Sequence, residues 1–294
     1  MRNHAANKRE PLFHIVKRDA LPLWKSILVR VIAILLALLV CAVVVVFITD
    51  LNPLEVYKSM FDGAFGSSRK IWTTMQNTAI LLCISLAVTP AFKMRFWNIG
   101  AEGQVMVGCL GTAACMILIG DKVPAPLLMV IMVVVSIACG TLWGVLPAIF
   151  KAYWNTNESL FTLMMNYVAI QLVSFFCTVW ENPKGSATIG MINMNSQAGW
   201  FPSLFGQKYL LNILIVLVLT IGMYIYLKYN KHGYEIAVVG ESQNTARYVG
   251  MNVKKIIIRT MALSGAICGV AGLLLVAGTD HTLTTSSAGG MGFT

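Results

Sequence analysis

Charged residues are scarce in this chain: Asp, Glu, Lys and Arg make up 12% of its 294 residues. A soluble globular domain usually carries about 25%. So few charges cannot cover the surface of a water-soluble protein, whereas a lipid-facing surface needs none because the surrounding hydrocarbon is itself apolar. With 57% hydrophobic residues and a mean hydropathy of +0.73, the chain is predicted to be an integral membrane protein.

Several chemical signatures are also missing. The sequence contains no G-x-x-x-x-G-K-[ST] phosphate-binding loop, no H-E-x-x-H zinc motif and no C-x-x-C pair. All seven cysteines lie within apolar runs, where a thiol acts as a small packing residue. These absences argue against an enzyme, a metal site and a disulfide scaffold on this chain. No cofactor is expected on it, and any energy from ATP must come from another subunit.

Seven segments approach the roughly 20 apolar residues that a membrane-spanning helix requires. The third is short and glycine-rich, and the first is too long for the core of a signal peptide, so we expect it to be retained. The chain stops soon after the seventh, and we expect a truncated C-terminus. The predicted spans are 27–49, 72–92, 104–120, 127–150, 158–180, 209–228 and 256–278.

Basic residues predict the orientation of these spans. If the N-terminus is cytoplasmic, 16 of the 22 Lys and Arg residues fall on the cytoplasmic side, as the positive-inside rule requires. The cations are spread between apolar runs instead of gathered on one face, so the net charge of +10 does not indicate nucleic-acid binding. The predicted order is a cytoplasmic segment at 1–26, a transmembrane domain at 27–278 and the start of a further segment at 279–294.

Two of the connecting loops are long. Residues 181–208 are predicted to lie outside the cell, as a plain connection or as a docking surface. Residues 229–255 are predicted to lie in the cytoplasm. There Asn244 is an expected N-cap and Gly250 an expected C-terminal stop for a short helix. This segment is either a solvated loop or a contact for a soluble partner.

The segment Phe96–Gln104 places polar residues and glycines between two spans. Asn98 and Glu102 are four residues apart and share a face if the segment is helical. A carboxylate beside a membrane span is costly unless it faces a cavity or a partner. The segment is therefore either a broken helix lining a transport path or a cytoplasmic turn.

A second polar stretch opens the fifth predicted span. Asn157 is placed to cap that helix, with Glu158 in its first turn near the positive end of the helix dipole. Thr162 and Asn166 then form a polar stripe inside an apolar helix. Such residues usually face neighbouring helices, and both helix packing and pore lining account for Asn166. Elsewhere Gly140/Gly144 and Gly265/Gly269 predict closely packed helices.

Together, these polar segments resemble one family. The string Trp97–Gln104, the stretch from Asn157 to Tyr167 and the stretch from Gly233 to Gly250 are similar to the permeases of bacterial ABC importers in the ribose and branched-chain amino-acid transporter superfamily. The closest branch is that of nucleoside and simple-sugar permeases. The resemblance implies an all-α fold of the type II importer permease class, in the bacterial inner membrane and in contact with membrane lipid.

The resemblance also implies partners and roles for residues. The partners are a second permease subunit, an ATPase subunit that holds ATP and Mg²⁺, and an extracytoplasmic solute-binding lipoprotein. The residues that the resemblance implies for the translocation path are Asn98, Glu102, Gln104, Asn157, Glu158, Thr162 and Asn166. The residues that it implies for coupling to the ATPase are Gly240, Glu241, Asn244, Ala246, Arg247 and Gly250. The alternative is a stand-alone secondary transporter or channel, which would need its own coupling-ion site near the bilayer midplane.

Overall fold

The computed structural model describes residues 22–49 and 51–293, and within these ranges its regular secondary structure is helical, apart from one isolated bridge between Leu204 and Gln207. The chain divides into two compact units, Met1–Gly66 and Ser67–Thr294. Most of the predicted cytoplasmic segment 1–26 lies outside the described residues, and the first helix already begins at Leu23.

The first unit holds α1 (Leu23–Thr49) and α2 (Pro53–Phe65). The α1 helix is a predicted span that begins four residues earlier than expected. The α2 helix was not predicted, because at 13 residues it is too short to register in a search for spans of about 20. Its start is nevertheless well specified: the Asn52 side chain accepts a hydrogen bond from the Leu54 N–H, and proline occupies the first helical position.

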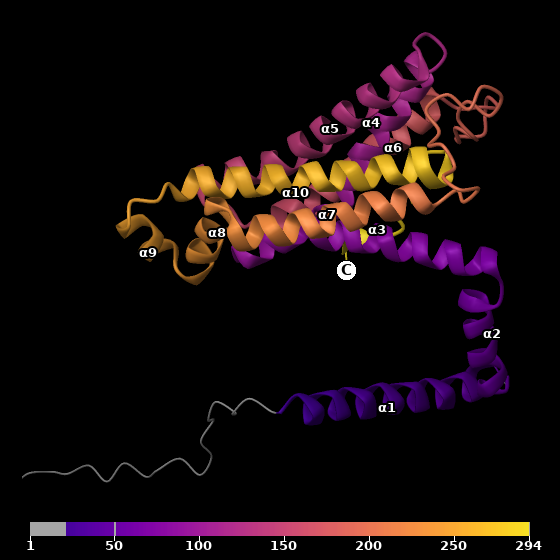
Figure 1. The fold of residues 1–294 in the computed structure, drawn as a ribbon, viewed down its shortest axis with the longest axis horizontal. Helices are drawn as coiled ribbons and strands as arrows, with labels where there is room; N and C mark the ends of the chain where they lie inside the picture. The colour runs from indigo at the N-terminus through magenta and orange to yellow at the C-terminus, as the bar shows by residue number, and fades with distance from the viewer. Residues whose placement is uncertain (1–21, 50, 294) are drawn as a thin grey trace, which may run out of the picture. The chain divides into compact units, whose positions relative to one another are not determined.

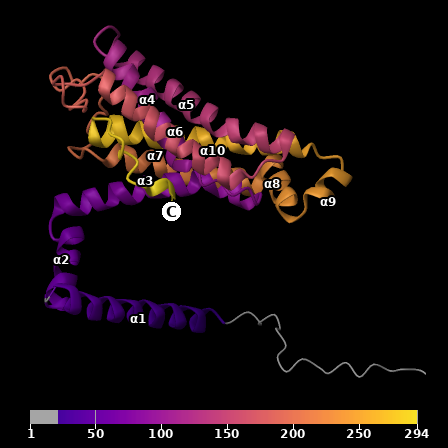
Figure 2. The ribbon, with the colours of Figure 1, turned by 180° about the vertical axis from the view of Figure 1, so that it is seen from behind.

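The second unit is a bundle with two short helices gathered at one end (Figures 1 and 2). Within residues 22–49 and 51–293, seven helices are long and apolar enough to cross a membrane, as predicted, with ends that differ from the expected ones by a few residues. The helices of this unit are α3 (Ser68–Lys93), α4 (Ala101–Ile119), α5 (Ala125–Trp154), α6 (Glu158–Val179), α7 (Leu210–Tyr229), α8 (Lys231–Glu241), α9 (Gln243–Tyr248) and α10 (Val253–Leu275), which continues into a π turn at Val276–Asp280.

The α10 helix is the centre of this bundle, packed against α3, α4 and α5. Its closest approach is to α5, where Gly140 lies against the Gly265 backbone and Gly144 against that of Met261. A Cβ atom at Gly140 or Gly265 would collide with backbone of the opposite helix. The predicted small-residue packing is confirmed, and the two predicted glycine pairs contact each other.

Large apolar side chains on α5, α6 and α7 point outward, among them Leu142, Phe175 and Val218. A water-soluble protein would not leave such continuous apolar faces exposed, whereas lipid favours them. By contrast, α4 and α10 are mostly buried. The bundle therefore has α4 and α10 in its interior, where apolar, small and polar side chains pack together, and apolar helix faces surround them.

The long loop 181–208 packs onto the end of the bundle. The Trp200 ring stacks on His281 at 3.8 Å between centroids, and its Nε1–H donates to the Ile192 carbonyl. The Asn193 amide donates to the Met116 carbonyl at the end of α4. The Phe201 N–H also bonds to the Ala277 carbonyl in the π turn that ends α10, so the loop is an ordered cap over the ends of α4 and α10.

Candidate functional site

The segment between α3 and α4 is non-helical, and alternate residues along it are buried. The α3 helix ends at Lys93 and α4 begins at Ala101, while Phe96, Asn98 and Gly100 between them are shielded from solvent. The predicted interruption of the helix is confirmed. The expectation that Asn98 and Glu102 share a helical face is wrong, because Asn98 precedes the helix. Its side-chain oxygen instead accepts a hydrogen bond from the Gly100 N–H at 3.0 Å.

The α6 helix supplies hydrogen-bond partners for this non-helical backbone. Asn166 donates to the Ile99 carbonyl and accepts from the Gly103 N–H, both at 2.8 Å. One turn earlier, the Thr162 hydroxyl accepts from the Ile99 N–H at 3.2 Å. The polar stripe on α6 thus pairs with the main chain of the broken segment. This arrangement satisfies backbone groups that would be costly to leave unpaired at membrane depth.

Asn98 and Gln104 extend the network toward α10. The Asn98 amide nitrogen lies 3.3 Å from the Ser264 hydroxyl, and the Gln104 amide nitrogen lies 3.4 Å from the Asn98 oxygen. Among the described residues, the buried Gln104 Oε1 atom has no hydrogen-bond partner. The network therefore ties α4, α6 and α10 together and retains one free acceptor. We name Asn98, Gln104, Thr162, Asn166 and Ser264 the polar lock.

Glu102 is buried in the first turn of α4. Its two carboxylate oxygens accept from the Gly290 N–H at 3.0 Å and the Gly292 N–H at 2.7 Å. These hydrogen bonds hold the chain at 290–292 against the start of α4, where the helix dipole also favours a negative charge. Glu102 therefore joins a segment nearly 200 residues away to the start of α4.

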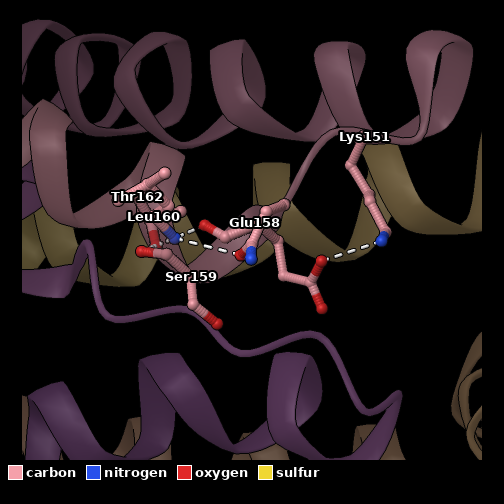
Figure 3. Close-up of polar contacts among 6 residues, drawn as sticks. Lys151, Glu158, Ser159, Leu160 and Thr162 are labelled. Atoms are coloured by element: carbon pink, nitrogen blue, oxygen red, sulfur yellow. Dashed lines mark hydrogen bonds and ion pairs between the residues drawn. The ribbon is translucent and has the colours of Figure 1, made fainter.

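Asn157 and Glu158 lie apart from this cluster, at the junction of α5 and α6. The Asn157 side chain caps α6 by accepting from the Leu160 N–H, which confirms that prediction. Glu158 forms an ion pair with Lys151 at 2.8 Å, as Figure 3 shows. Thr162 lies one turn further along α6 and donates to the Glu158 carbonyl. The predicted path residues thus divide into the buried polar lock, Glu102 with its hydrogen bonds to residues 290–292, and the more exposed start of α6.

The predicted coupling residues fall on α8 and α9. The N-cap of α9 is Ser242, whose side chain accepts from the Thr245 N–H, so the assignment of Asn244 as N-cap is wrong. Gly250 is the predicted stop, with φ of +82°. The Gly250 N–H bonds to Arg247 and the Met251 N–H to Ala246, which is the Schellman pattern favoured by glycine.

Burial divides these coupling residues into two sets. Ala246 is fully buried, and Gly240 lies so close to the Lys93 carbonyl that no side chain fits there. Ala246 therefore anchors α9 to its own chain and is not part of its outer face. Glu241, Asn244 and Arg247 are exposed. Sequence reasoning missed Tyr248, whose side chain is 91% exposed beside them.

A second buried polar cluster was also missed. Gln76 on α3 donates to the Thr279 hydroxyl at 2.7 Å, and the Asn212 amide on α7 lies 3.4 Å from the same oxygen. Thr279 belongs to the π turn that ends α10, a distortion often found at functional sites. The sequence signal for this cluster was a polar amide, Gln76 or Asn212, inside each of two apolar runs. This cluster joins α3, α7 and α10 at the end opposite α8.

The space beside the polar lock is too small to hold a solute. The cavity beside Asn98 and Ile99 measures about 60 Å³, whereas pockets for small molecules span about 300–1,000 Å³. The same residues contain no group of three or more His, Cys, Asp or Glu side chains arranged to hold a metal ion. The arrangement is suited to holding helices in register, with polar groups that are able to exchange partners.

Comparisons with known proteins agree with this architecture. Residues 71–293 match the family described as the branched-chain amino acid transport system permease component. The guanosine ABC transporter permease protein of Bacillus subtilis is 29% identical over 271 residues, covering 91% of this chain and 77% of the relative. The nucleoside ABC transporter permease protein of Lactococcus lactis is 26% identical, with 90% and 74% covered.

A third relative, the glucose ABC transporter permease protein of Haloferax volcanii, is 26% identical over 288 residues, covering 94% of this chain and 75% of the relative. No solved structure matches the chain. The family match covers most of the chain, including the polar lock, Glu102 and the α8–α9 segment. The chain therefore belongs to this family of transport-system permease components, and it is a membrane-spanning permease subunit of an ABC importer.

Proposed function

We propose that this permease carries a nucleoside or a simple sugar. Two of the relatives described above are named for guanosine or nucleoside transport and a third for glucose transport. The interior of the bundle offers amides, hydroxyls and a carboxylate instead of a ring of charges. Such groups suit the hydroxyl-rich, uncharged surface of these solutes, whereas an amino acid also requires partners for its ammonium and carboxylate groups.

The observation that carries the proposal is the polar lock beside non-helical backbone. Backbone of this kind is tolerated at membrane depth where it is packed in protein or lines a water-filled cavity. We infer that Asn98, Gln104, Thr162 and Asn166 brace the path, and that Glu102 holds the adjoining segment in place. In the other access state, the same amides exchange partners with the solute or with water.

ATP hydrolysis is assigned to a separate ATPase subunit that holds ATP and Mg²⁺. In this proposal Glu241 at the end of α8 and the exposed face of α9, with Asn244, Arg247 and Tyr248, dock on that subunit. Ala246 and Gly240 act from beneath by fixing α9 and α8 to the bundle. A second permease subunit completes the path, and a solute-binding lipoprotein delivers solute on the opposite side of the membrane.

The proposed orientation places the N-terminus and residues 229–255 in the cytoplasm of a bacterial cell, with loop 181–208 outside the inner membrane. The support is the distribution of basic residues. A membrane-impermeant thiol reagent added to intact cells should label Ser196→Cys and spare Asn244→Cys. Labelling of the second variant alone would reverse the assignment.

The solute is tested by ATP hydrolysis and uptake in vesicles containing the complete transporter and its binding protein. Guanosine or glucose should stimulate both, while leucine should stimulate neither. Glu102→Gln, which retains the shape of the side chain but removes its charge, should abolish uptake although the complex still assembles. Uptake driven by an ion gradient without the ATPase subunit would instead support the stand-alone secondary transporter.

The coupling surface is tested with Arg247→Glu, and Lys122→Glu is the matched control because it makes the same charge reversal in the loop between α4 and α5. Arg247→Glu should reduce solute-stimulated hydrolysis or release the ATPase subunit, while the control should not. Ala246→Trp should have a different effect, since a large ring cannot fit in the buried site and should displace α9. Normal coupling in Arg247→Glu would remove α9 from the proposed interface.

A further inference from the structure

A polar hollow of about 330 Å³ lies where α7, α8 and α10 meet. These elements gather at the end of the bundle that carries α9 (Figure 1). The lining includes Lys231 at the start of α8, and Lys255 and Arg259 on successive turns of α10. Glu235 is the one carboxylate among the lining residues. The excess of positive charge indicates a ligand that is an anion.

Two helix N-termini also open into this hollow. The α8 helix is capped by the Asn230 side chain, which accepts from the His232 N–H, and α10 by Asn252, which accepts from the Lys255 N–H. Both capping residues line the hollow. The positive ends of the two helix dipoles therefore add to the three basic side chains. Lys231, Lys255 and Arg259 form no ion pair with any part of the chain that the structure describes.

The base of the hollow is closed by His232, whose side chain is only 1% exposed. The Thr260 hydroxyl donates to the Ile256 carbonyl, so its oxygen is free to accept the Nε2–H of His232 at 3.4 Å. The Tyr226 hydroxyl then donates to Nδ1 at 2.7 Å. Both ring nitrogens are thus bound to the protein. The ring closes the base of the hollow and leaves ligand binding to the basic side chains.

An apolar groove continues from the hollow along α7. It measures about 500 Å³ and is lined by Gly222, Ile225, Tyr226 and Tyr229 before it reaches Asn230 and Lys231, which the two spaces share. A Cβ atom added at Gly222 would meet nothing within 4 Å. A cationic hollow joined to an apolar groove on a membrane-spanning helix matches a molecule with a charged head and a hydrocarbon tail.

We propose that the hollow binds the phosphate headgroup of an anionic phospholipid, with one acyl chain of that lipid lying in the α7 groove. Basic pockets between membrane helices are suited to such headgroups. Arg259 lies in the second turn of a span, where a charge requires a partner or a path to the interface. A free phosphate would use the hollow but leave the groove empty. An acidic segment of a soluble partner would not reach along the membrane-facing side of α7.

The test uses the full-length permease, purified with the subunits that remain bound to it, and measures binding of phosphatidylglycerol and phosphatidylcholine by native mass spectrometry. Phosphatidylglycerol should bind more tightly than phosphatidylcholine. Arg259→Gln and Lys255→Gln should each weaken its binding about five-fold, from about 1 kcal/mol per cation near a membrane surface. Lys254→Gln is the matched control, because its ammonium lies over the Tyr153 ring, outside the hollow. Glu235→Gln should strengthen binding.

Gly222→Leu separates the lipid from free phosphate. This substitution fills the groove without changing the charge of the hollow. It should therefore weaken the binding of phosphatidylglycerol and leave the binding of inorganic phosphate unchanged. Equal binding of the two lipids, or equal effects of Arg259→Gln and Lys254→Gln, would overturn the proposal. The proposal would also be overturned if Arg259→Gln or Lys255→Gln released the ATPase subunit while lipid binding stayed unchanged. That result would assign the hollow to a protein contact. Solute uptake is measured separately, so failure here leaves the transport proposal standing.

Discussion

The α4 and α7 helices are nearly equal in length, at 19 and 20 residues, but they occupy opposite environments. The most apolar part of α4 has a mean hydropathy of 1.6 and is 78% buried, whereas that of α7 has a value of 2.4 and is 17% buried. The less hydrophobic helix is therefore inside. A soluble protein of the same helices would be expected to show the opposite order.

The physical reason is the solvent. Lipid chains are as apolar as leucine, so no hydrophobic force brings two spans together, and association depends on close packing and hydrogen bonds. The α4 helix has Gly108 against Gly269 of α10, and Gly103 bonded to Asn166. By contrast, the exposed side chains of α7 include Leu217, Val218 and Ile221, which are large and apolar. Small and polar residues thus mark the contacts that α4 makes with its neighbours, whereas α7 presents large apolar side chains on its exposed surface.

The largest effect is expected where two backbones touch. Gly265→Leu should place a side chain against the Gly140 carbonyl, which cannot move aside, and should lower the stability of the bundle by about 3 kcal/mol or more. The melting temperature of the purified protein in detergent measures this. Gly222→Leu on α7 is the matched control and should leave stability unchanged, since that position faces open space. Equal destabilisation by both changes would contradict the contrast between buried and exposed helices.

A smaller effect is expected in the polar lock. Asn166→Leu should leave the Ile99 carbonyl and the Gly103 N–H without their partner, at a cost of about 1–3 kcal/mol. Thermal unfolding and uptake should both be impaired. Thr178→Ala, on an exposed part of the same helix where the hydroxyl bonds only to its own helix, should change neither. If the two substitutions behave alike, the hydrogen bonds of Asn166 are not what holds α6 to the broken segment.

Acidification is expected to weaken the bundle moderately through two histidines that flank the buried α10. Burial lowers the pKa of His232 below its ordinary value of 6.5, and Arg259 lowers it further against the opposing effect of Glu235. Burial also lowers the pKa of His281. The unfolded chain binds these protons more readily, so stability is complete above about pH 6.5 and declines as the pH falls below it.

Melting temperatures at pH 7.5 and pH 5.5 measure this decline. In His232→Gln the difference between the two pH values should be smaller than in the parent protein, whatever the stability of the variant itself. A melting temperature that rises on acidification, or an unchanged pH difference in the variant, would show that His232 does not titrate in this way.

The smallest effect is expected at the Lys151–Glu158 ion pair in the more exposed junction of α5 and α6. Lys151→Gln should cost no more than about 1 kcal/mol, because partly exposed pairs gain little and are screened by salt. The melting temperature in low and high salt provides the measurement. A loss as large as that in Asn166→Leu would mean that this pair belongs energetically to the polar lock.

The sequence by itself determined the membrane class, the seven spans and the family. These depend on properties that are local along the chain: apolar runs of about 20 residues, and short polar strings such as Trp97–Gln104. The Asn157 cap and the Gly250 stop were also predictable, since capping involves residues only a few positions apart. The α2 helix was missed because its length is below that of a span, and the Ser242 cap because Asn244 was an equally suitable residue type.

Tertiary structure alone decided which polar residues meet. Glu102 binds the backbone at Gly290 and Gly292, Asn166 binds Ile99, and Gln76 contacts Thr279 across some 200 residues. Nothing local specifies such pairs, because each side chain has several partners of suitable chemistry along the chain. The burial of Ala246 and the hollow between Lys231 and Arg259 likewise depend on how α8, α9 and α10 pack. Their geometry follows from helix contacts that only the folded bundle creates.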